Sequence, residues 1–105
     1  MGDIKHLAVV KFKEGVVVED IVKGMEKLVS EIDIVKSFEW GQDTGNIEML
    51  SQGFTHTFTV TFRSAEDLAT YVSHPSHVEF SGIFSAAIEK AILLDFPTVV
   101  VKAPA

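Results

Sequence analysis

Residues 54–63 constrain the fold more than any other stretch, because two kinds of side chain alternate along them. The alternation sets Phe54, His56, Phe58, Val60 and Phe62 against Thr55, Thr57, Thr59 and Thr61. Successive side chains of a strand point to opposite faces of a sheet, so a period of two predicts a strand. Aromatic, valine and threonine residues also favour strands. The chain must therefore contain a sheet with one face packed on a core.

Three further segments are predicted to be strands. Residues 4–13 alternate in the same manner, and shorter apolar segments follow at 35–40 and 93–102. Pro97 interrupts the last segment, which indicates an edge strand or a bulge because proline cannot donate to a ladder. Residues 41–53 are polar and rich in turn residues, and they are predicted to form a loop.

Helices are predicted between these strands. The acidic pair Glu19 and Asp20 opens the first, which ends near Asp33 and has the apolar stripe Ile21, Val22, Met25, Leu28, Val29 and Ile32.

Two more helices are predicted before the last strand. Ser64 and Asp67 resemble a capping box and open a short helix, which stops at His74 because a proline follows. Ser76 and Glu79 repeat the capping pattern, and the apolar stripe of the final helix is Ile83, Phe84, Ala87, Ile88 and Ala91.

This order of elements predicts an α+β fold of the ferredoxin-like type, βαββαβ, as one domain over residues 1–105. Its four-stranded sheet has helices on one face, and the first and third strands are central neighbours. His6 and His56 are then expected side by side beneath the helices, sharing a cavity. The opposite face carries Leu7 and Val9 beside the threonines. A homodimer that covers this face is expected, since most oligomers are closed two-fold pairs.

Composition excludes several classes of function. The 105 residues are 47% hydrophobic and include no cysteine, so the core needs no disulfide and thiolate chemistry is excluded. A net charge of −6 argues against nucleic acid as a partner. No apolar run is long enough for a membrane helix, and the start of the chain lacks a secretory signal. We therefore expect a cytoplasmic protein without a membrane partner.

The four histidines, at positions 6, 56, 74 and 77, mark the candidate site. A neutral imidazole accepts a proton near physiological pH, and a phenol donates to a developing oxyanion, so His77 and Tyr71 form a candidate acid–base pair that requires no cofactor. Two alternatives remain open. The histidines can be structural, with His74 at a helix end, or they can bind a metal, although a proline interrupts the helical register between His74 and His77. Trp40 is expected in the core rather than as a stacking platform.

Four segments carry a resemblance to a known family: residues 5–13, 38–41, 53–56 and 71–78, which read KHLAVVKFK, FEWG, GFTH and YVSHPSHV. In this order and spacing they resemble the stress-responsive dimeric α/β-barrel family of plants and bacteria. The resemblance spans nearly the whole chain. It implies a small stress-response protein that forms a dimer, in which the two sheets close into a barrel. It also implies a histidine-lined pocket under the helices for a small apolar ligand.

One branch of that family, the olivetolic acid-type polyketide cyclases, performs an intramolecular C2–C7 aldol condensation on a linear polyketide thioester. The resemblance implies that His77 is the catalytic base, that Tyr71 supports it, and that the substrate pocket includes His6, His56, Met25 and Phe80. Met25 departs from the cyclase pattern, which has a tyrosine there. Whether the chain is an enzyme of this lyase type or only binds its ligand stays open.

The same resemblance implies a magnesium site after the first helix. The metal is held there by main-chain carbonyl oxygens, which correspond to Val29, Ile32, Asp33 and Val35 in this chain. Carbonyl oxygens at a helix C-terminus are of the type that Mg²⁺ accepts.

Overall fold

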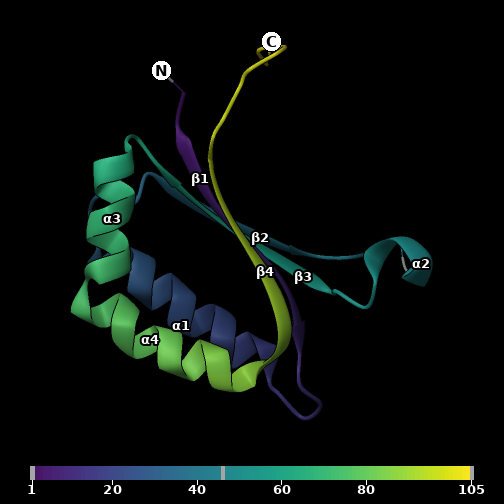
Figure 1. Ribbon diagram of the computed structural model, residues 1–105. Coiled ribbons are helices and arrows are strands. Elements are labelled where there is room, and N and C mark those ends of the chain that lie inside the picture. The colour runs from purple at the N-terminus through teal and green to yellow at the C-terminus, as the bar shows by residue number, and fades with distance from the viewer. Residues whose placement is uncertain (1, 46, 105) are drawn as a thin grey trace.

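The computed structural model describes residues 2–45 and 47–104, and in it four antiparallel strands form one sheet with helices on one face (Figure 1). The elements are β1 (Ile4–Phe12), α1 (Val18–Glu31), β2 (Ser37–Gln42), α2 (Glu48–Ser51), β3 (His56–Phe62), α3 (Ala65–Ser73), α4 (Pro75–Ala87) and β4 (Ile88–Pro97). The strand order is β2-β3-β1-β4, with β1 and β3 at the centre. The predicted ferredoxin-like α+β fold is confirmed.

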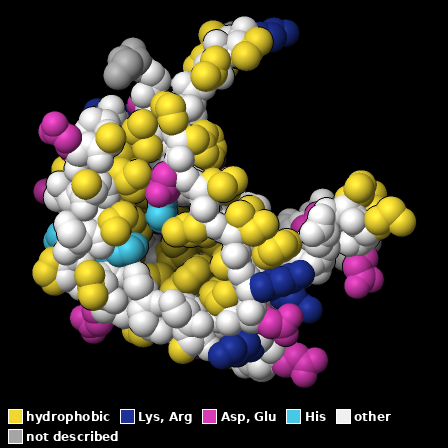
Figure 2. Space-filling view, in the orientation of Figure 1, with side chains coloured by type: hydrophobic (Ala, Val, Ile, Leu, Met, Phe, Trp, Pro, Cys, Tyr) yellow, Lys and Arg dark blue, Asp and Glu magenta, His cyan; other side chains and the backbone are white. Residues whose placement is uncertain are grey.

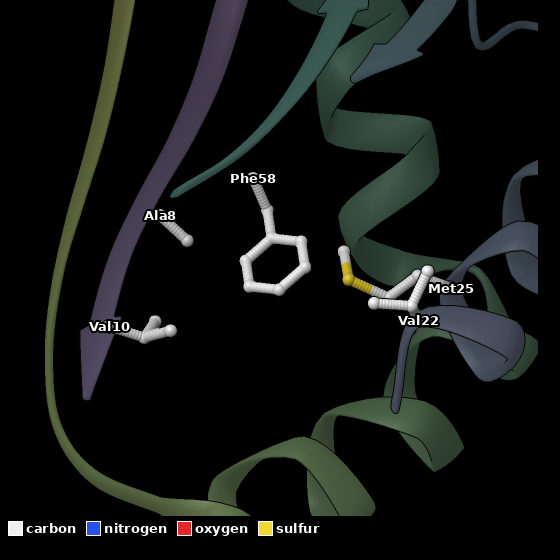
Figure 3. Packing of buried hydrophobic residues seen from close by; sticks show 5 residues of the cluster. All are labelled: Ala8, Val10, Val22, Met25 and Phe58. Carbon is white, nitrogen blue, oxygen red and sulfur yellow. The ribbon is translucent and has the colours of Figure 1, made fainter. Parts of the chain in front are cut away.

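The sheet buries the face that alternation assigns to the core. We call this the inner face, and its β1 and β3 residues include His6, Ala8, Val10, His56, Phe58, Val60 and Phe62. Figure 3 shows the Phe58 ring between strand residues Ala8 and Val10 and the α1 residues Val22 and Met25. Val10 is 0% exposed and Phe58 is 1% exposed. Full burial of such a side chain contributes about 1.5–3 kcal/mol to folding.

Helix α1 covers this core because its apolar residues recur at helical spacing. Ile21, Val22, Met25 and Leu28 are its buried residues. Gly24 allows α1 to approach α4 closely, since a Cβ there would lie 2.7 Å from Cε1 of Phe80. Any larger residue at this position would displace the Phe80 ring.

The second face, which we call the outer face, is not covered by α1, α3 or α4, and α2 lies near one end of it, where Leu50 and Ser51 border a cavity with Val9 and Thr57. The outer face carries Leu7 and Val9 of β1, the threonines of β3, and three β4 residues that pair opposite outer positions of β1. These are Ile92, Leu94 and Phe96, which are 44%, 51% and 38% exposed. The outer face is thus a partly apolar surface that α1, α3 and α4 leave uncovered.

The boundary between the last helix and β4 was predicted wrongly. Helix α4 ends at Ala87 and β4 begins at Ile88, where the prediction continued the helix to Ala91 and began the strand at Leu93. The reason is the pairing with β1, which runs from Phe12 opposite Ile88 to Ile4 opposite Pro97. Strand pairing along the whole of β1 overrides the helical spacing of these apolar residues. Beyond Pro97 the predicted strand does not continue.

Two local predictions also need correction. Residues 41–53, predicted as a loop, contain the single-turn helix α2, which ends at Ser51 and is followed by Gln52 in the left-handed conformation. Helix α4 is capped by His74 rather than by Ser76, because Nδ1 of His74 accepts a hydrogen bond from the Ser76 N–H at 3.1 Å. Residues 1, 46 and 105, which the predictions included, lie outside the described residues.

Within the described residues, no helix has both the length and the apolar character needed to cross a membrane.

Candidate active site in the central pocket

A cavity of about 450 Å³ lies between the inner face and helices α3 and α4, and we call it the central pocket. Its walls are mostly apolar, including Met25, Phe58 and Phe80, and its polar side chains are His6, Tyr71, His77, Ser81, Ser85 and Asp95. Figure 2 shows the hollow, with histidine atoms and an acidic side chain at its rim and hydrophobic side chains at its floor. A largely apolar cavity with a few converging polar groups is typical of a small-molecule site.

Tyr71 lies at the centre of the polar groups. Its side chain is 2% exposed and packs against Phe62, with ring centroids 5.0 Å apart. Burial raises the pKa of Tyr71 to about 12, because the charged phenolate is poorly solvated there. Tyr71 is therefore a neutral phenol at physiological pH, able to donate a hydrogen bond to a ligand oxygen.

His77 lies beside Tyr71, with ring centroids 4.6 Å apart. Its Nδ1 is 3.0 Å from the carbonyl oxygen of Val72, in the last turn of α3, where carbonyls lack intrahelical partners. A carbonyl only accepts, so Nδ1 carries the proton and donates it, which leaves the Nε2 lone pair of a neutral His77 free. Burial lowers the pKa of His77, the Val72 hydrogen bond opposes this, and the charge of His6 lowers it further. His77 is thus a neutral imidazole with the properties of a general base.

His6 and Asp95 form a second polar pair in the pocket. The β1–β4 register places them opposite each other, and Nδ1 of His6 is 2.5 Å from Oδ1 of Asp95. The carboxylate accepts from this nitrogen, which fixes the orientation of the ring. The His6 ring contacts Tyr71 edge-on, at 6.0 Å between centroids. His6, Tyr71 and His77 consequently form a row along the pocket wall.

Asp95 was missed by the sequence analysis. The available signal is that Asp95 is an isolated acid in the apolar run 91–97. Asp95 reaches His6 only through the β1–β4 register. This register could not be predicted, because the start of β4 was misplaced.

His56 lies outside the central pocket, so the prediction that it sits beside His6 is wrong. In the β1–β3 register His56 pairs with Val10, whereas His6 pairs with Val60. The two histidines share a face but lie toward opposite ends of the strand pair. His56 is 8% exposed, its Nδ1 lies 2.7 Å from Oγ1 of Thr55, and burial lowers its pKa.

The other predicted site residues divide into two groups. Met25 and Phe80 line the central pocket, and their role in substrate binding stays a prediction. His74 is at a helix end, where it caps α4, so it is not part of the pocket. Among the described residues, no three His, Asp or Glu side chains come together as a metal site.

The predicted magnesium site involves carbonyl oxygens just after α1, at Val29, Ile32, Asp33 and Val35. The Ile32 carbonyl there already accepts a hydrogen bond from the Val35 N–H at 3.1 Å. A carbonyl oxygen has a second lone pair, so these oxygens are of the type that a hard cation accepts. Magnesium would have a structural role here, because these residues do not line the central pocket.

The fold and pocket together define a class, the ferredoxin-like α+β domains with an internal site between sheet and helices. The chain belongs to the Dabb family, the Stress responsive A/B Barrel Domain, whose sequence profile matches residues 4–98. The predicted membership is confirmed.

Two relatives illustrate the range of the family. A stress-response A/B barrel domain-containing protein of Arabidopsis thaliana is 57% identical over 98 residues, which cover 93% of this chain and 88% of that protein. Olivetolic acid cyclase of Cannabis sativa is 34% identical over 96 residues, covering 89% of this chain and 94% of the cyclase.

Solved structures agree with the fold. An Arabidopsis thaliana protein matches with a TM-score of 0.86 and 41% identity, over 95% of this chain and 99% of its own. Hydroxynitrile lyase from Passiflora edulis matches with a TM-score of 0.85 over 97% and 98% of the two chains, and at 23% identity it supports the fold alone. A bacterial neighbour from Thermobifida fusca, with a TM-score of 0.77, 19% identity and 92% coverage of both chains, is described as dimeric and ferredoxin-like.

Proposed function

We propose that this protein is a homodimeric stress-response α/β-barrel protein whose central pocket binds a small, largely apolar molecule that carries a carbonyl group. The observation that carries the proposal is the row formed by His6, Tyr71 and His77 on one wall of an otherwise apolar cavity. Apolar walls contribute affinity, and Tyr71 as a neutral donor fixes the ligand oxygen.

The outer face supports the homodimer. Apolar β4 side chains are about half exposed there, and a surface of this kind in a small domain marks an interaction site. Two copies that pair through their outer faces bury these side chains symmetrically and close the two sheets into a barrel. The solved neighbour described as dimeric has the same fold.

Ligand binding is tested by isothermal titration calorimetry, with olivetolic acid titrated into the protein. This compound is part of the name of the cyclase relative. Ala8→Phe fills the pocket from β1 and is expected to weaken binding by more than about tenfold, since the added ring occupies ligand space. Ala69→Phe adds the same ring on the exposed side of α3 and is expected to bind as the wild type does. Equal binding by Ala8→Phe, or none by the wild type, would contradict the proposal for this ligand class.

A second candidate function is catalysis, which the fixed tautomer of His77 specifically favours. Nε2 of His77 removes a proton from a carbon between two carbonyls, and the Tyr71 hydroxyl donates to the enolate oxygen. The carbanion attacks a second carbonyl of the same molecule and forms a carbon–carbon bond. The alkoxide so produced takes the proton back from His77. This step closes a ring within one molecule, and the name of the cyclase relative likewise denotes a cyclisation.

Catalysis is tested by supplying the protein with a polyketide synthase and its starter thioester. The wild type is expected to raise the yield of cyclised acid, and His77→Ala and Tyr71→Phe to reduce the rate by about 10²-fold or more. His74→Asn serves as the matched control, because it removes an imidazole outside the pocket and keeps a capping acceptor. If all four proteins give only the uncatalysed products, the catalytic candidate fails while ligand binding can still hold.

A further inference from the structure

Trp40 does not lie in the core, although the sequence analysis placed it there. It is the only tryptophan of the chain, on the edge strand β2, and it is 46% exposed. One side of its ring system is occupied: the ring stacks nearly parallel on Phe58, at 6.2 Å and 19°, and on His56, at 6.3 Å and 22°. The indole is therefore partly exposed at the sheet edge, where a ligand can reach its uncovered side.

A second cavity lies beside this indole. It measures about 430 Å³, lies between β2 and α1, and we call it the Trp40 groove. Its polar lining is Glu19, Lys23, Glu26, Gln42 and His56. None of its lining residues lines the central pocket. Phe58 separates the two cavities, because it lines the central pocket and stacks on Trp40.

The charges of the groove favour a cation. Glu19 and Glu26 are exposed and form no ion pair within the described residues, and they outnumber the single ammonium group of Lys23. The whole chain also has a net charge of −6, which attracts cations in general. His56 also lines the groove. It is 8% exposed, and its Nε2 has no hydrogen-bond partner among the described residues. Burial lowers the pKa of His56, so this imidazole adds no positive charge to the groove.

We propose that the Trp40 groove binds a small organic cation, a quaternary or protonated amine, on the exposed face of the indole and beside the carboxylates of Glu19 and Glu26. The tryptophan ring is the best cation–π partner among the side chains. The two carboxylates supply the counter-charge, and Gln42 and the free nitrogen of His56 supply hydrogen bonds to polar substituents of the ligand. This site is separate from the central pocket and does not depend on its function.

The first test uses the fluorescence of Trp40, which reports on this groove alone because the chain has no other tryptophan. Choline chloride is expected to give a saturable change, with a dissociation constant on the order of millimolar. Sodium chloride at equal ionic strength and the neutral isostere 3,3-dimethyl-1-butanol are expected to give no saturable change. If choline gives none, or if the isostere gives the same one, the proposal is overturned.

The second test uses variants. Glu26→Gln is expected to weaken choline binding by about two- to fivefold, and Glu66→Gln, which removes an exposed acid on α3, to leave it unchanged. Trp40→Phe, followed by proton NMR of the choline methyl groups, is expected to weaken binding by a similar factor. Unchanged binding by both groove variants overturns the proposal. Urea denaturation of Glu26→Gln and Trp40→Phe serves as a fold control, since it does not depend on a ligand in either cavity.

Discussion

The two faces of the sheet are made by the same strands, yet they differ sharply in exposure. On the inner face Val10, Phe58 and Phe62 are 0%, 1% and 0% exposed, because α1, α3 and α4 cover them. On the outer face Ile92 and Leu94 are 44% and 51% exposed. The inner face therefore accounts for the stability of the subunit, and the outer face is available for association. Four experiments test this division.

The largest effect is expected from truncation of the inner face. Phe58→Ala removes a buried ring and should lower the free energy of unfolding by about 3–5 kcal/mol. Thr57→Ala, the adjacent outer residue of β3, should change it by no more than about 0.5 kcal/mol. Urea denaturation measures both. A small loss for Phe58→Ala would show that the inner face is not the source of stability.

The next largest effect concerns the outer face. Leu94→Asp places a charge in the proposed dimer contact and should raise the dimer dissociation constant by about thirtyfold or more. Val78→Asp, at a 60% exposed apolar position on α4, is the matched control and should leave assembly unchanged. Sedimentation equilibrium gives the constants. A wild type that sediments as a monomer would refute the role assigned to the outer face.

A smaller effect is expected from pH, through the histidines of the inner face and the pocket. Burial lowers the pKa of His56 and of His77 below the ordinary value of 6.5, so the unfolded chain binds protons that the folded chain does not. Stability should therefore be greatest above pH 6.5 and should decline as the pH falls from 6.5 toward the lowered folded values. Denaturation midpoints across this pH window measure how steeply stability changes with pH, and His56→Gln should reduce this slope. His74→Asn is the control, and equal slopes in both variants would contradict the assignment.

The smallest effect should come from a polar contact on the outer face. Nζ of Lys5 donates to Oγ1 of Thr61 at 2.8 Å, and Thr61 is 2% exposed. A double-mutant cycle of Lys5→Met and Thr61→Val should give a coupling free energy of about 0.5–1.5 kcal/mol. No coupling would mean that the long side chain of Lys5 stabilises this face by covering it rather than by its hydrogen bond.

A structural feature can be predicted from the sequence when it depends on residues of a single segment, and not when it depends on pairing between segments. The alternation of residues 56–62 and the stripe of α1 are local patterns, so the element order and the ferredoxin-like fold followed from them. Residues 88–91 fit a helical stripe and a strand equally well, and only pairing with β1 decides between them. The start of β4 was therefore wrong.

The same distinction explains the candidate site. Tyr71 and His77 lie close together in sequence across the turn at Pro75, and their proximity was predicted. The contact of His6 with Asp95 and the separation of His6 from His56 depend on strand register, which single-strand patterns do not contain. Trp40 is exposed because β2 is an edge strand, and apolar character alone does not distinguish an edge from a centre.

Gly24 has a consequence for the volume of the central pocket. It does not line the central pocket, yet its missing side chain leaves room for Phe80, which does. Exchange of Gly24 for alanine would push the Phe80 ring aside and change the volume of the cavity without altering any polar group in it. The volume of the central pocket and the polar groups that line it are thus set by different residues, so a substitution at Gly24 can change the first without the second.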